Sequence, residues 1–381
     1  MKVYIDISVL TLSTFVTGIQ RVTVKIVLGL IKEGVHDIKL IHYNAALKRF
    51  QEVDNKAFVD YYTLGRGIKE HMITKKSVYV RDMEEGDIFF DLDAAWMSRM
   101  KRSYLLPLLS ENKVKIVTHI YDIISITHPQ YCLERGVYNF MDFLGAHLEY
   151  SDLFITNAQA TLNEINELTK DFNKKIPPIK VIPLGSDFAA KTFKGEVSDR
   201  VRQSTSRPYI LMVGTIEPRK NHALTLDAYD KGLKEMGYDL IFAGYMGWNM
   251  EDFEKRLKSH PDYQKRIFHF EGLGDQDIDH LYKRASFLVF ASETEGFGLP
   301  LIEAVKNETP VVCMDIPVSR EVMGDKCLWF KRGDVDSLVE TVKKYTDDKE
   351  AYEKYKESLK TAVFPTWEET VSKVSEALSS L

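Results

Sequence analysis

The sequence predicts an α/β protein with two doubly wound domains, each a largely parallel sheet covered by helices on both faces. Two observations predict this fold class. The chain has 381 residues, which exceeds the ~250–300 residues at which a single core usually stops growing. Short β-type runs also alternate with helix-length amphipathic segments along the whole chain. We therefore expect two domains with a boundary near the middle.

The first half of the chain supplies one sheet and its helices. Strands are expected at 2–6, 38–43, 87–91, 115–120, 152–156 and 180–184. Helices are expected at 18–32, 98–110, 131–149 and 158–169. The polar stretch 191–208 then interrupts the alternation and has the composition of a linker. The first domain is therefore expected to cover residues 1–195.

The second half restarts the pattern and predicts a second sheet. Its strands are expected at 209–214, 239–244, 266–270, 286–291, 309–314 and 327–330. The second domain is expected over residues 205–365, and a terminal helix, 366–381, is expected to pack back on the first domain. Doubly wound sheets bind ligands beyond the carboxyl ends of their strands. We therefore expect the functional residues on loops after strands, facing a cleft between the domains.

Composition excludes several classes of protein. The net charge of −5 argues against a generally basic surface that would bind nucleic acid. The three cysteines are odd in number and far apart in sequence, which argues against a disulfide framework or a zinc site and favours a reducing cytoplasm. Asp6 interrupts the only apolar run near the amino terminus, and no apolar run approaches the ~18–20 residues that span a bilayer. We expect a cytoplasmic protein whose membrane contact, if any, is peripheral.

The strongest motif is Glu295-Gly-Phe-Gly-Leu-Pro-Leu-Ile-Glu303, directly after the expected strand 286–291. Pro300 suits the first position of a helix, which places Glu303 in the first turn. Free N–H groups at such a helix start attract anionic or hydroxyl-rich ligands, and the two carboxylates can accept hydrogen bonds from vicinal hydroxyls. The alternative is a tight turn with a carboxylate that only complements the helix dipole.

The second motif, GTIEPRKN (214–221), follows the expected strand 209–214. Gly214 lets the backbone turn closely, Arg219 and Lys220 place two cations before a helix, and Asn221 can cap that helix. Such a pair can neutralise a diphosphate, and the alternative is a solvated loop with two surface cations. A weaker third motif, 13–22, contains Gly18 and Arg21, which suit either a phosphate or an ordinary helix entry.

Together these motifs resemble the donor site of glycosyltransferase family 4, whose members are retaining, metal-independent enzymes of the GT-B fold, with two Rossmann-like domains. The resemblance covers essentially the whole chain and is most specific in the second half. The opening DIS…TGIQRV and the segment YDIISITHPQY (121–131) resemble a subgroup that assembles bacterial O-antigen, capsule and related polysaccharides, often as mannosyl- or rhamnosyltransferases.

The resemblance implies a role for each matching residue. Arg219 and Lys220 would hold the donor diphosphate, Glu303 the ribose, and Glu295 the hydroxyls of the transferred sugar. The implied donor-binding positions are Gly18, Ile19, Gly214, Phe270, Gly272, Leu273, Gly296, Phe297, Gly298 and Leu299. Many family members carry a His-Asp pair in the first domain, but here the dipeptide is Tyr121-Asp122. We expect His119 and Asp122 to face the cleft.

Two further patterns have competing interpretations. Asp91-Leu-Asp93 matches the Asp-x-Asp pattern that chelates a divalent metal in GT-A enzymes, but the pattern recurs by chance, and we expect a structural or acceptor-side role and no metal. The basic and apolar alternation in 99–109 could rest on anionic lipid headgroups or form a solvated face. The same alternatives apply to a lysine cluster: Lys170, Lys174, Lys175 and Lys180.

The sequence therefore predicts retaining, metal-independent sugar transfer without a cofactor. The donor would be a GDP-, UDP- or dTDP-sugar, and the acceptor a hydroxyl of a growing, lipid-linked glycan. A non-catalytic relative that binds nucleotide sugar or scaffolds a glycan-assembly complex is the alternative. A nicotinamide-dependent dehydrogenase is remote, because no Gly-x-Gly-x-x-Gly follows any expected strand.

Overall fold

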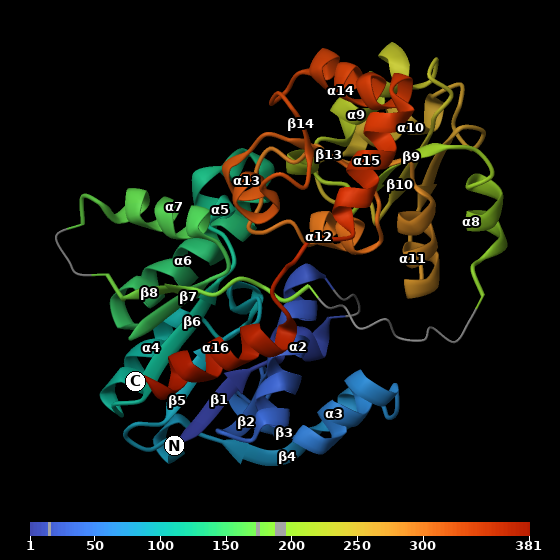
Figure 1. Cartoon of the computed structure of the whole chain (residues 1–381). Coiled ribbons are helices and arrows are strands. Elements are labelled where there is room, and N and C mark those ends of the chain that lie inside the picture. The colour runs from blue at the N-terminus through green and yellow to red at the C-terminus, as the bar shows by residue number, and fades with distance from the viewer. Residues whose placement is uncertain (14–16, 173–175, 187–195) are drawn as a thin grey trace. The chain divides into compact units, whose positions relative to one another are not determined.

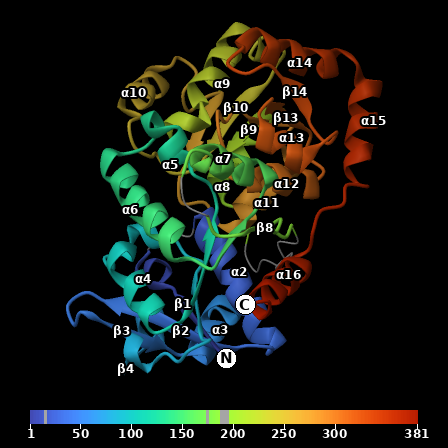
Figure 2. The same cartoon turned by 90° about the vertical axis from the view of Figure 1, so that its left-hand side faces the viewer.

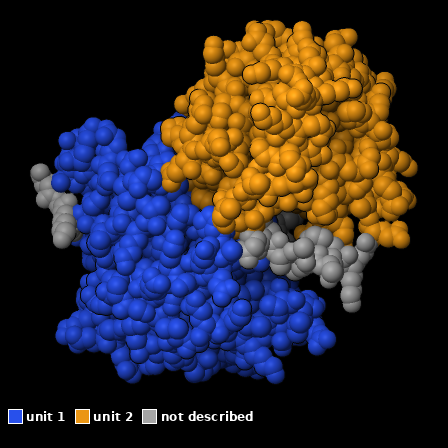
Figure 3. Space-filling view, in the orientation of Figure 1, with its two compact units in different colours: residues 1–185, 365–381 blue, residues 186–364 orange. Residues whose placement is uncertain are grey.

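The computed structural model of the chain describes residues 1–13, 17–172, 176–186 and 196–381. The chain divides into two compact units, Met1–Gly185 with Pro365–Leu381 (unit 1) and Ser186–Phe364 (unit 2) (Figure 3). Each unit contains its own sheet with helices against both faces (Figures 1 and 2). The first division point lies before the expected end of the first domain at residue 195.

Unit 1 is built on an eight-stranded sheet in the order β4-β3-β2-β1-β5-β6-β7-β8. Its strands are β1 (Lys2–Asp6), β2 (Asp37–Asn44), β3 (Arg49–Val53), β4 (Ile73–Val78), β5 (Ile88–Asp91), β6 (Lys115–Ile120), β7 (Leu153–Thr156) and β8 (Ile179–Val181). Each strand expected in the first half forms. The sequence did not predict β3 and β4, which pair antiparallel at one edge and make this sheet mixed.

The helices of unit 1 include those expected. They are α1 (Ser8–Leu12), α2 (Gly18–Glu33), α3 (Asn55–Leu64), α4 (Arg102–Glu111), α5 (Ile124–Thr127), α6 (Glu134–Tyr150), α7 (Gln159–Thr169) and α16 (Trp367–Ser379). The terminal helix α16 packs closely on α2. The two helices approach so closely at Gly29 that a Cβ there would lie 2.4 Å from a methyl group of Val371. The buried His36 ring lies 3.1 Å from the Ser375 carbonyl oxygen, which fixes the other end of the contact.

A buried ionic network joins the strands and helices of unit 1. Arg102, only 1% exposed, donates to both oxygens of Asp91 at 2.5 Å and to Asp6 at 2.7 Å. The ring Nε2 of His147 lies 2.9 Å from Oδ2 of Asp91, the oxygen that also accepts from Nε of Arg102. Burial would raise the pKa of the Asp91 carboxyl, but the Arg102 charge and these hydrogen bonds lower it. The network links β1, β5, α4 and α6.

Unit 2 is built on a six-stranded parallel sheet in the order β11-β10-β9-β12-β13-β14. Its strands are β9 (Tyr209–Val213), β10 (Asp239–Ala243), β11 (Ile267–Phe270), β12 (Phe287–Phe290), β13 (Val311–Met314) and β14 (Leu328–Phe330). Its helices are α8 (Asp199–Ser204), α9 (His222–Ala228), α10 (Glu251–Ser259), α11 (Asp275–Arg284), α12 (Leu299–Lys306), α13 (Pro317–Met323), α14 (Val335–Asp347) and α15 (Lys349–Leu359). Each strand expected in the second half forms.

The prediction of a linker at 191–208 is wrong for residues 199–204. Residues 199–204 form α8, whose Val201 is fully buried. Ser198, just before α8, donates from its backbone to Asp277 at 2.8 Å and from its hydroxyl to the same carboxylate at 3.1 Å. The polar composition of this stretch therefore reflects a surface helix anchored on α11. Residues 191–195 lie outside the described residues.

No helix in the described part of the chain combines the length and apolar composition that a bilayer-spanning helix needs.

Candidate functional site

The two strongest sequence motifs come together at one edge of the unit 2 sheet. Strand β9 pairs directly with β12, so the loops that follow them leave the same edge side by side. The strand order also reverses here, since the chain runs from β9 outward to β11 and then returns to β12. Such a topological switch point is where open α/β sheets bind ligands. The motifs 214–221 and 295–303 therefore form one candidate site.

Glu295 binds both cations of the neighbouring loop. Its Oε2 lies 2.7 Å from Nη1 of Arg219, and its Oε1 accepts a hydrogen bond from Nζ of Lys220. Arg219 also contacts Glu217 Oε1 at 2.7 Å and donates to the Thr294 carbonyl at 3.0 Å. The side chains of Lys220 and Glu295 are only 12% and 7% exposed. This group of four, Glu217, Arg219, Lys220 and Glu295, is called the cation–carboxylate cluster below.

Burial and charge act in opposite directions in this cluster. Burial alone would raise the pKa of the Glu295 carboxyl, but the charges of Arg219 and Lys220 outweigh it and lower that pKa to about 2. Burial lowers the pKa of the Lys220 ammonium, even though Glu295 favours its charged form. The cluster therefore holds Glu295 as a carboxylate and makes the charge on Lys220 dependent on an anion beside it.

A third carboxylate, Glu293, contacts the loop 214–221. Glu293 accepts a hydrogen bond from the Asn221 amide at 3.0 Å and pairs with Arg332 at 2.7 Å. Its backbone N–H donates to the Arg219 carbonyl at 2.8 Å. Asn221 was expected to cap the next helix, but its side chain makes no cap hydrogen bond and binds Glu293 instead. Sequence reasoning missed both Glu217 and Glu293, although Glu217 stands inside the quoted motif.

Glu303 lies one residue further into its helix than expected. Helix α12 begins at Leu299 after Gly298, whose φ of 94° is left-handed, so Glu303 is in the second turn. Its Oε2 accepts a hydrogen bond from the hydroxyl of Tyr282 at 2.8 Å. Gly296 and Phe297 lie in the loop before the helix, and Leu299 is its first residue. The carboxylate is therefore held in place from α11, a contact that the sequence did not predict.

Close glycine contacts bring the neighbouring loops together. Gly214 adopts a φ of 130°, and a Cβ at Gly244 would lie 1.9 Å from the Gly214 carbonyl oxygen. The Gly244 N–H in turn donates to the Phe270 carbonyl at 2.9 Å. Gly272 has a φ of 63° and lies against Tyr245, just before Leu273. The loop after β11 thus follows the same sheet edge as the cation–carboxylate cluster.

The candidate residues of unit 1 lie on separate elements, at the start of α2 and after β6. Gly18 and Ile19 are the first residues of α2, and Arg21 follows in its first turn. Asp122 comes after β6 and accepts a hydrogen bond from the Ile124 N–H at 3.0 Å. Residues 14–16 of the third motif lie outside the described residues.

His119 lies within β6 and is only 1% exposed, stacked on Tyr121 with ring centroids 4.3 Å apart. Burial lowers the pKa of His119 to about 4, which keeps the ring neutral near pH 7. The expectation that His119 faces a cleft between the units stays a prediction.

Asp91 and Asp93 have buried structural partners. Asp91 belongs to the network with Arg102, and Asp93 accepts hydrogen bonds from the Leu10 N–H at 2.6 Å and the Ala94 N–H at 2.8 Å. Burial raises the pKa of Asp93 to about 7. Among the described residues no group of three or more His, Cys, Asp or Glu side chains is arranged to hold a metal ion.

The expected lysine cluster is only partly described. Lys170 pairs with Glu167, and Lys180 donates to the Ser380 hydroxyl at 2.9 Å. Lys174 and Lys175 lie outside the described residues.

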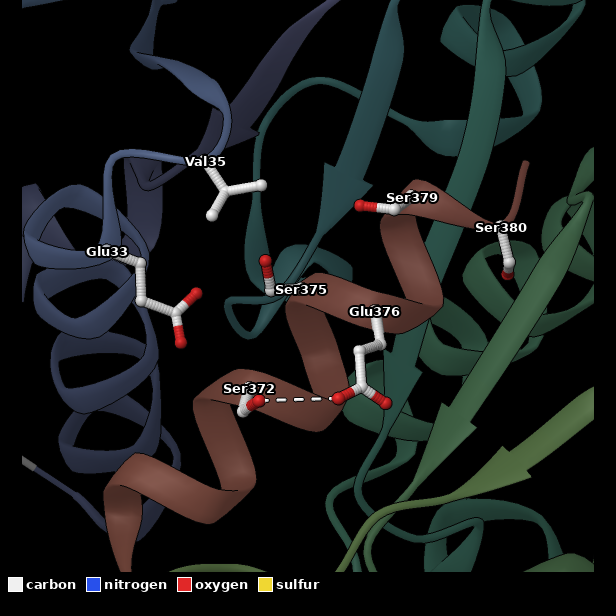
Figure 4. A pocket seen from close by; sticks show the side chains of 7 residues that line it. All are labelled: Glu33, Val35, Ser372, Ser375, Glu376, Ser379 and Ser380. Carbon is white, nitrogen blue, oxygen red and sulfur yellow. Dashed lines mark hydrogen bonds between the residues drawn. The ribbon is translucent and has the colours of Figure 1, made fainter.

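A separate hollow of about 630 Å³ lies between the end of α2 and α16 in unit 1 (Figure 4). Ser372 points toward Glu376 there, with a hydrogen bond of 3.4 Å, and Glu33 faces them from α2. None of the residues predicted from the sequence lines this hollow.

Two doubly wound units, each built on its own sheet, place this chain in the GT-B fold class. A solved structure titled Anabaena Alr3699/HepE in complex with UDP and glucose matches at a TM-score of 0.66 and 15% identity, over 100% of both chains. The model of the family described as "Glycosyl transferases group 1" matches residues 194–361. The matched residues include the whole candidate site of unit 2.

Named relatives extend the likeness over most of the chain. The serotype-specific mannosyltransferase WbdA of Escherichia coli is 27% identical over 88% of this chain and 41% of its own length. The chain thus spans about two fifths of WbdA. The O-antigen chain mannosyltransferase B of Escherichia coli is 28% identical over 84% of this chain and 85% of its own.

Proposed function

We propose that this chain is a glycosyltransferase that moves mannose, or else rhamnose, from a nucleotide sugar to a hydroxyl of a growing bacterial polysaccharide. One observation carries the proposal. Arg219 and Lys220 both form ion pairs with the buried carboxylate of Glu295, at the point where the strand order of the sheet reverses. The family of residues 194–361 and the mannosyltransferase relatives support the same reaction.

In the proposed reaction the two cations act on the leaving group. Arg219 and Lys220 would hold the donor diphosphate and stabilise the negative charge that develops as the bond between sugar C1 and the phosphate oxygen breaks. A new bond forms between C1 and the acceptor oxygen. The acceptor proton passes to an oxygen of the departing diphosphate, so the protein needs no separate base. Attack on the face from which the diphosphate leaves would retain the configuration at C1.

The remaining site residues would position the donor. Glu303, oriented by Tyr282, would accept hydrogen bonds from the ribose hydroxyls. The backbone amides of 296–299 at the start of α12 would bind the sugar and phosphate oxygens. Glu295 would turn toward the sugar hydroxyls once the diphosphate takes its place on the cations. The two fixed cations would do the work that a divalent metal does elsewhere, so the proposed enzyme needs no metal.

The acceptor side of the proposal rests on the first half of the chain. We propose a lipid-linked glycan as acceptor, with Asp122 as a residue of unit 1 that faces it. Gly18 and Ile19 would approach the donor diphosphate from unit 1. Burial of His119 makes it a weaker candidate than Asp122 for contact with substrate.

The first experiment identifies the nucleotide. The intact protein is heated with GDP-mannose and with UDP-, dTDP- and ADP-sugars, because a ligand that binds only the folded state raises the melting temperature. Mannosyl transfer to a synthetic acceptor is then followed by product mass, with and without EDTA. The anomeric configuration of the product is read by NMR.

Three variants test the site. Lys220→Ala and Glu303→Ala should each reduce transfer at least a hundredfold while the melting temperature without ligand changes little. Lys283→Ala is the matched control, because Lys283 is an exposed lysine that pairs with Asp279 on its own helix. Unchanged turnover in both Lys220→Ala and Glu303→Ala would refute the assignment.

A further inference from the structure

Glu217 is the member of the cation–carboxylate cluster to which the proposed reaction gives no role. Its Oε1 lies 2.7 Å from Nη2 of Arg219, and its side chain is only 5% exposed. Arg219 turns its other terminal nitrogen, Nη1, to Glu295 Oε2 at 2.7 Å and to the Thr294 carbonyl oxygen at 3.0 Å. The guanidinium is therefore held between two carboxylates from different loops.

Glu217 and Glu295 differ in how the chain holds them. Glu217 is followed by Pro218, which restricts the residue before it to extended backbone, and Glu217 has a φ of −139° and a ψ of 159°. Its carbonyl oxygen accepts a hydrogen bond from the Lys220 N–H at 3.0 Å. Glu295 is followed by Gly296, and glycine has the widest backbone freedom of all residues. The backbone therefore favours movement of Glu295 and retention of Glu217 when a ligand takes over the cations.

The loop after β10 fixes the backbone on the other side of Glu217. The Ile216 N–H donates to the Tyr245 carbonyl oxygen at 2.9 Å, and the Gly247 N–H donates to the Ile216 carbonyl oxygen at 2.8 Å. A Cβ at Gly247 would lie 3.4 Å from the Cβ of Glu217. Because the two loops are bonded this closely, we expect Glu217 and Arg219 to keep their places relative to one another.

The charge of Glu217 also acts on Lys220. Burial lowers the pKa of the Lys220 ammonium, whereas the charges of Glu295 and Glu217 raise it. A diphosphate held by Arg219 and Lys220 would therefore lie near a fixed negative charge, which repels a more negative ligand more strongly. After the sugar has left, the nucleoside diphosphate carries about one negative charge more than the nucleotide sugar near pH 7.

We propose that Glu217 is a positioning residue that stays on Arg219 throughout the reaction, and that its charge speeds release of the nucleoside diphosphate product. The inference rests on the proposed function, because it takes the donor diphosphate as the ligand of Arg219 and Lys220. Glu217 orients the guanidinium so that Nη1 is presented to the ligand. Its charge weakens the binding of product more than the binding of donor, so the site empties after each transfer.

The variant Glu217→Gln removes the charge and keeps a side-chain oxygen that can accept a hydrogen bond from Arg219. Isothermal titration of the intact protein measures its affinities for GDP, UDP, GDP-mannose and UDP-glucose without acceptor. We expect Glu217→Gln to bind the nucleoside diphosphate more tightly than the parent protein does. The ratio of affinity for nucleoside diphosphate to affinity for the matching nucleotide sugar should rise roughly fivefold or more, because the product carries the additional charge.

The variant Glu217→Ala removes the hydrogen bond together with the charge. It should bind nucleoside diphosphate roughly tenfold more weakly than Glu217→Gln, because Arg219 is no longer oriented. A time course of sugar transfer supplies a second measurement. Glu217→Gln should form product in a fast burst followed by a slower steady rate, because release has become limiting. Loss of a merely structural contact would not produce such a burst.

Asp315→Asn is the matched control. Asp315 follows β13 at the same sheet edge and pairs with Arg320 at 2.7 and 2.6 Å, so this variant also removes one carboxylate charge beside an arginine. Its nucleotide affinities should equal those of the parent protein. The melting temperatures of all variants without ligand report whether they are folded.

The outcomes separate this inference from the proposed function. If the parent protein binds GDP or UDP but Glu217→Gln binds the same nucleotide equally well or more weakly, only the inference is overturned. An unchanged ratio of product affinity to donor affinity, or an equal change in Asp315→Asn, also overturns it alone. If the parent protein binds none of the four nucleotides, the proposed function fails and the inference fails with it.

Discussion

Replacing Glu295 by Gln tests whether this carboxylate holds the place of the donor diphosphate. In the structure Glu295 occupies both Arg219 and Lys220. The lowering of its pKa from the usual 4.5 to about 2 corresponds to about 3 kcal/mol of net attraction to its surroundings. A diphosphate that takes over the cations must offset that attraction, which is worth roughly a hundredfold in binding.

We therefore expect Glu295→Gln to bind nucleoside diphosphate 10- to 100-fold more tightly, on the scale set by that attraction. Transfer of sugar should fall, because the glutamine cannot provide a carboxylate to the sugar hydroxyls. Isothermal titration with GDP and UDP measures the affinity for nucleoside diphosphate. The rate at which glycosylated product forms measures the transfer of sugar. Glu293→Gln is the matched control on the same loop, since Glu293 pairs with Arg332 and not with the two cations, and its affinity should change less than threefold.

The effect should depend on pH in a defined direction. Burial lowers the pKa of Lys220, and loss of Glu295 removes the charge that favours its protonated form. The gain in affinity should therefore be larger at pH 6 than at pH 8, with proton uptake when the diphosphate binds. Weaker or unchanged binding of nucleoside diphosphate by Glu295→Gln at pH 6 would refute the reasoning.

The remaining predictions concern contacts that support the site or the fold. Tyr282→Phe removes a hydrogen bond to the Glu303 carboxylate, so the donor KM should rise about tenfold with little change in kcat. Gly244→Ala places a Cβ 1.9 Å from the Gly214 oxygen, so the loop must shift and nucleotide affinity should fall. Arg102→Met leaves buried carboxylates unpaired, which should cost about 3–5 kcal/mol of stability and lower the melting temperature by roughly 10 °C.

Matched variants give each of these experiments a control. Tyr209→Phe removes another buried tyrosine hydroxyl, one that donates to the Leu281 carbonyl and not to Glu303, so the donor KM should stay the same. Gly145→Ala adds a methyl group where nothing lies within 4 Å, so nucleotide affinity should not change. Equal KM values for Tyr282→Phe and Tyr209→Phe would show that Tyr282 does not position Glu303. A drop of less than 2 °C for Arg102→Met would contradict the role given to the buried network.

The sequence predicted the sheets well where their strands are buried on both faces. Residues 287–290 and 311–314 are entirely buried, and such strands appear as uninterrupted apolar runs. The missed strand β4 has two exposed lysines at its centre, which suit an edge strand and look like a loop in the sequence. The α8 segment was misjudged because a short surface helix and a linker share the same polar composition.

The residue types of the candidate site were predictable from local motifs, but their partners were not. Glu303 bonds Tyr282 from a different helix, and Glu293 bonds Arg332 across 39 positions of sequence. Such pairs depend on sheet order and helix packing, which a single sequence does not specify. The position of Glu303 also shifted because the left-handed Gly298 sets the start of α12 at Leu299.

The cation–carboxylate cluster explains why net charge says little about this site. Two carboxylates and two cations offset one another within the cluster, so the ligand-free site has no large excess of positive charge to attract an anion over a distance. A diphosphate gains from the site only by replacing a carboxylate on Arg219 and Lys220. That replacement would free Glu295 at the moment when the sugar arrives beside it.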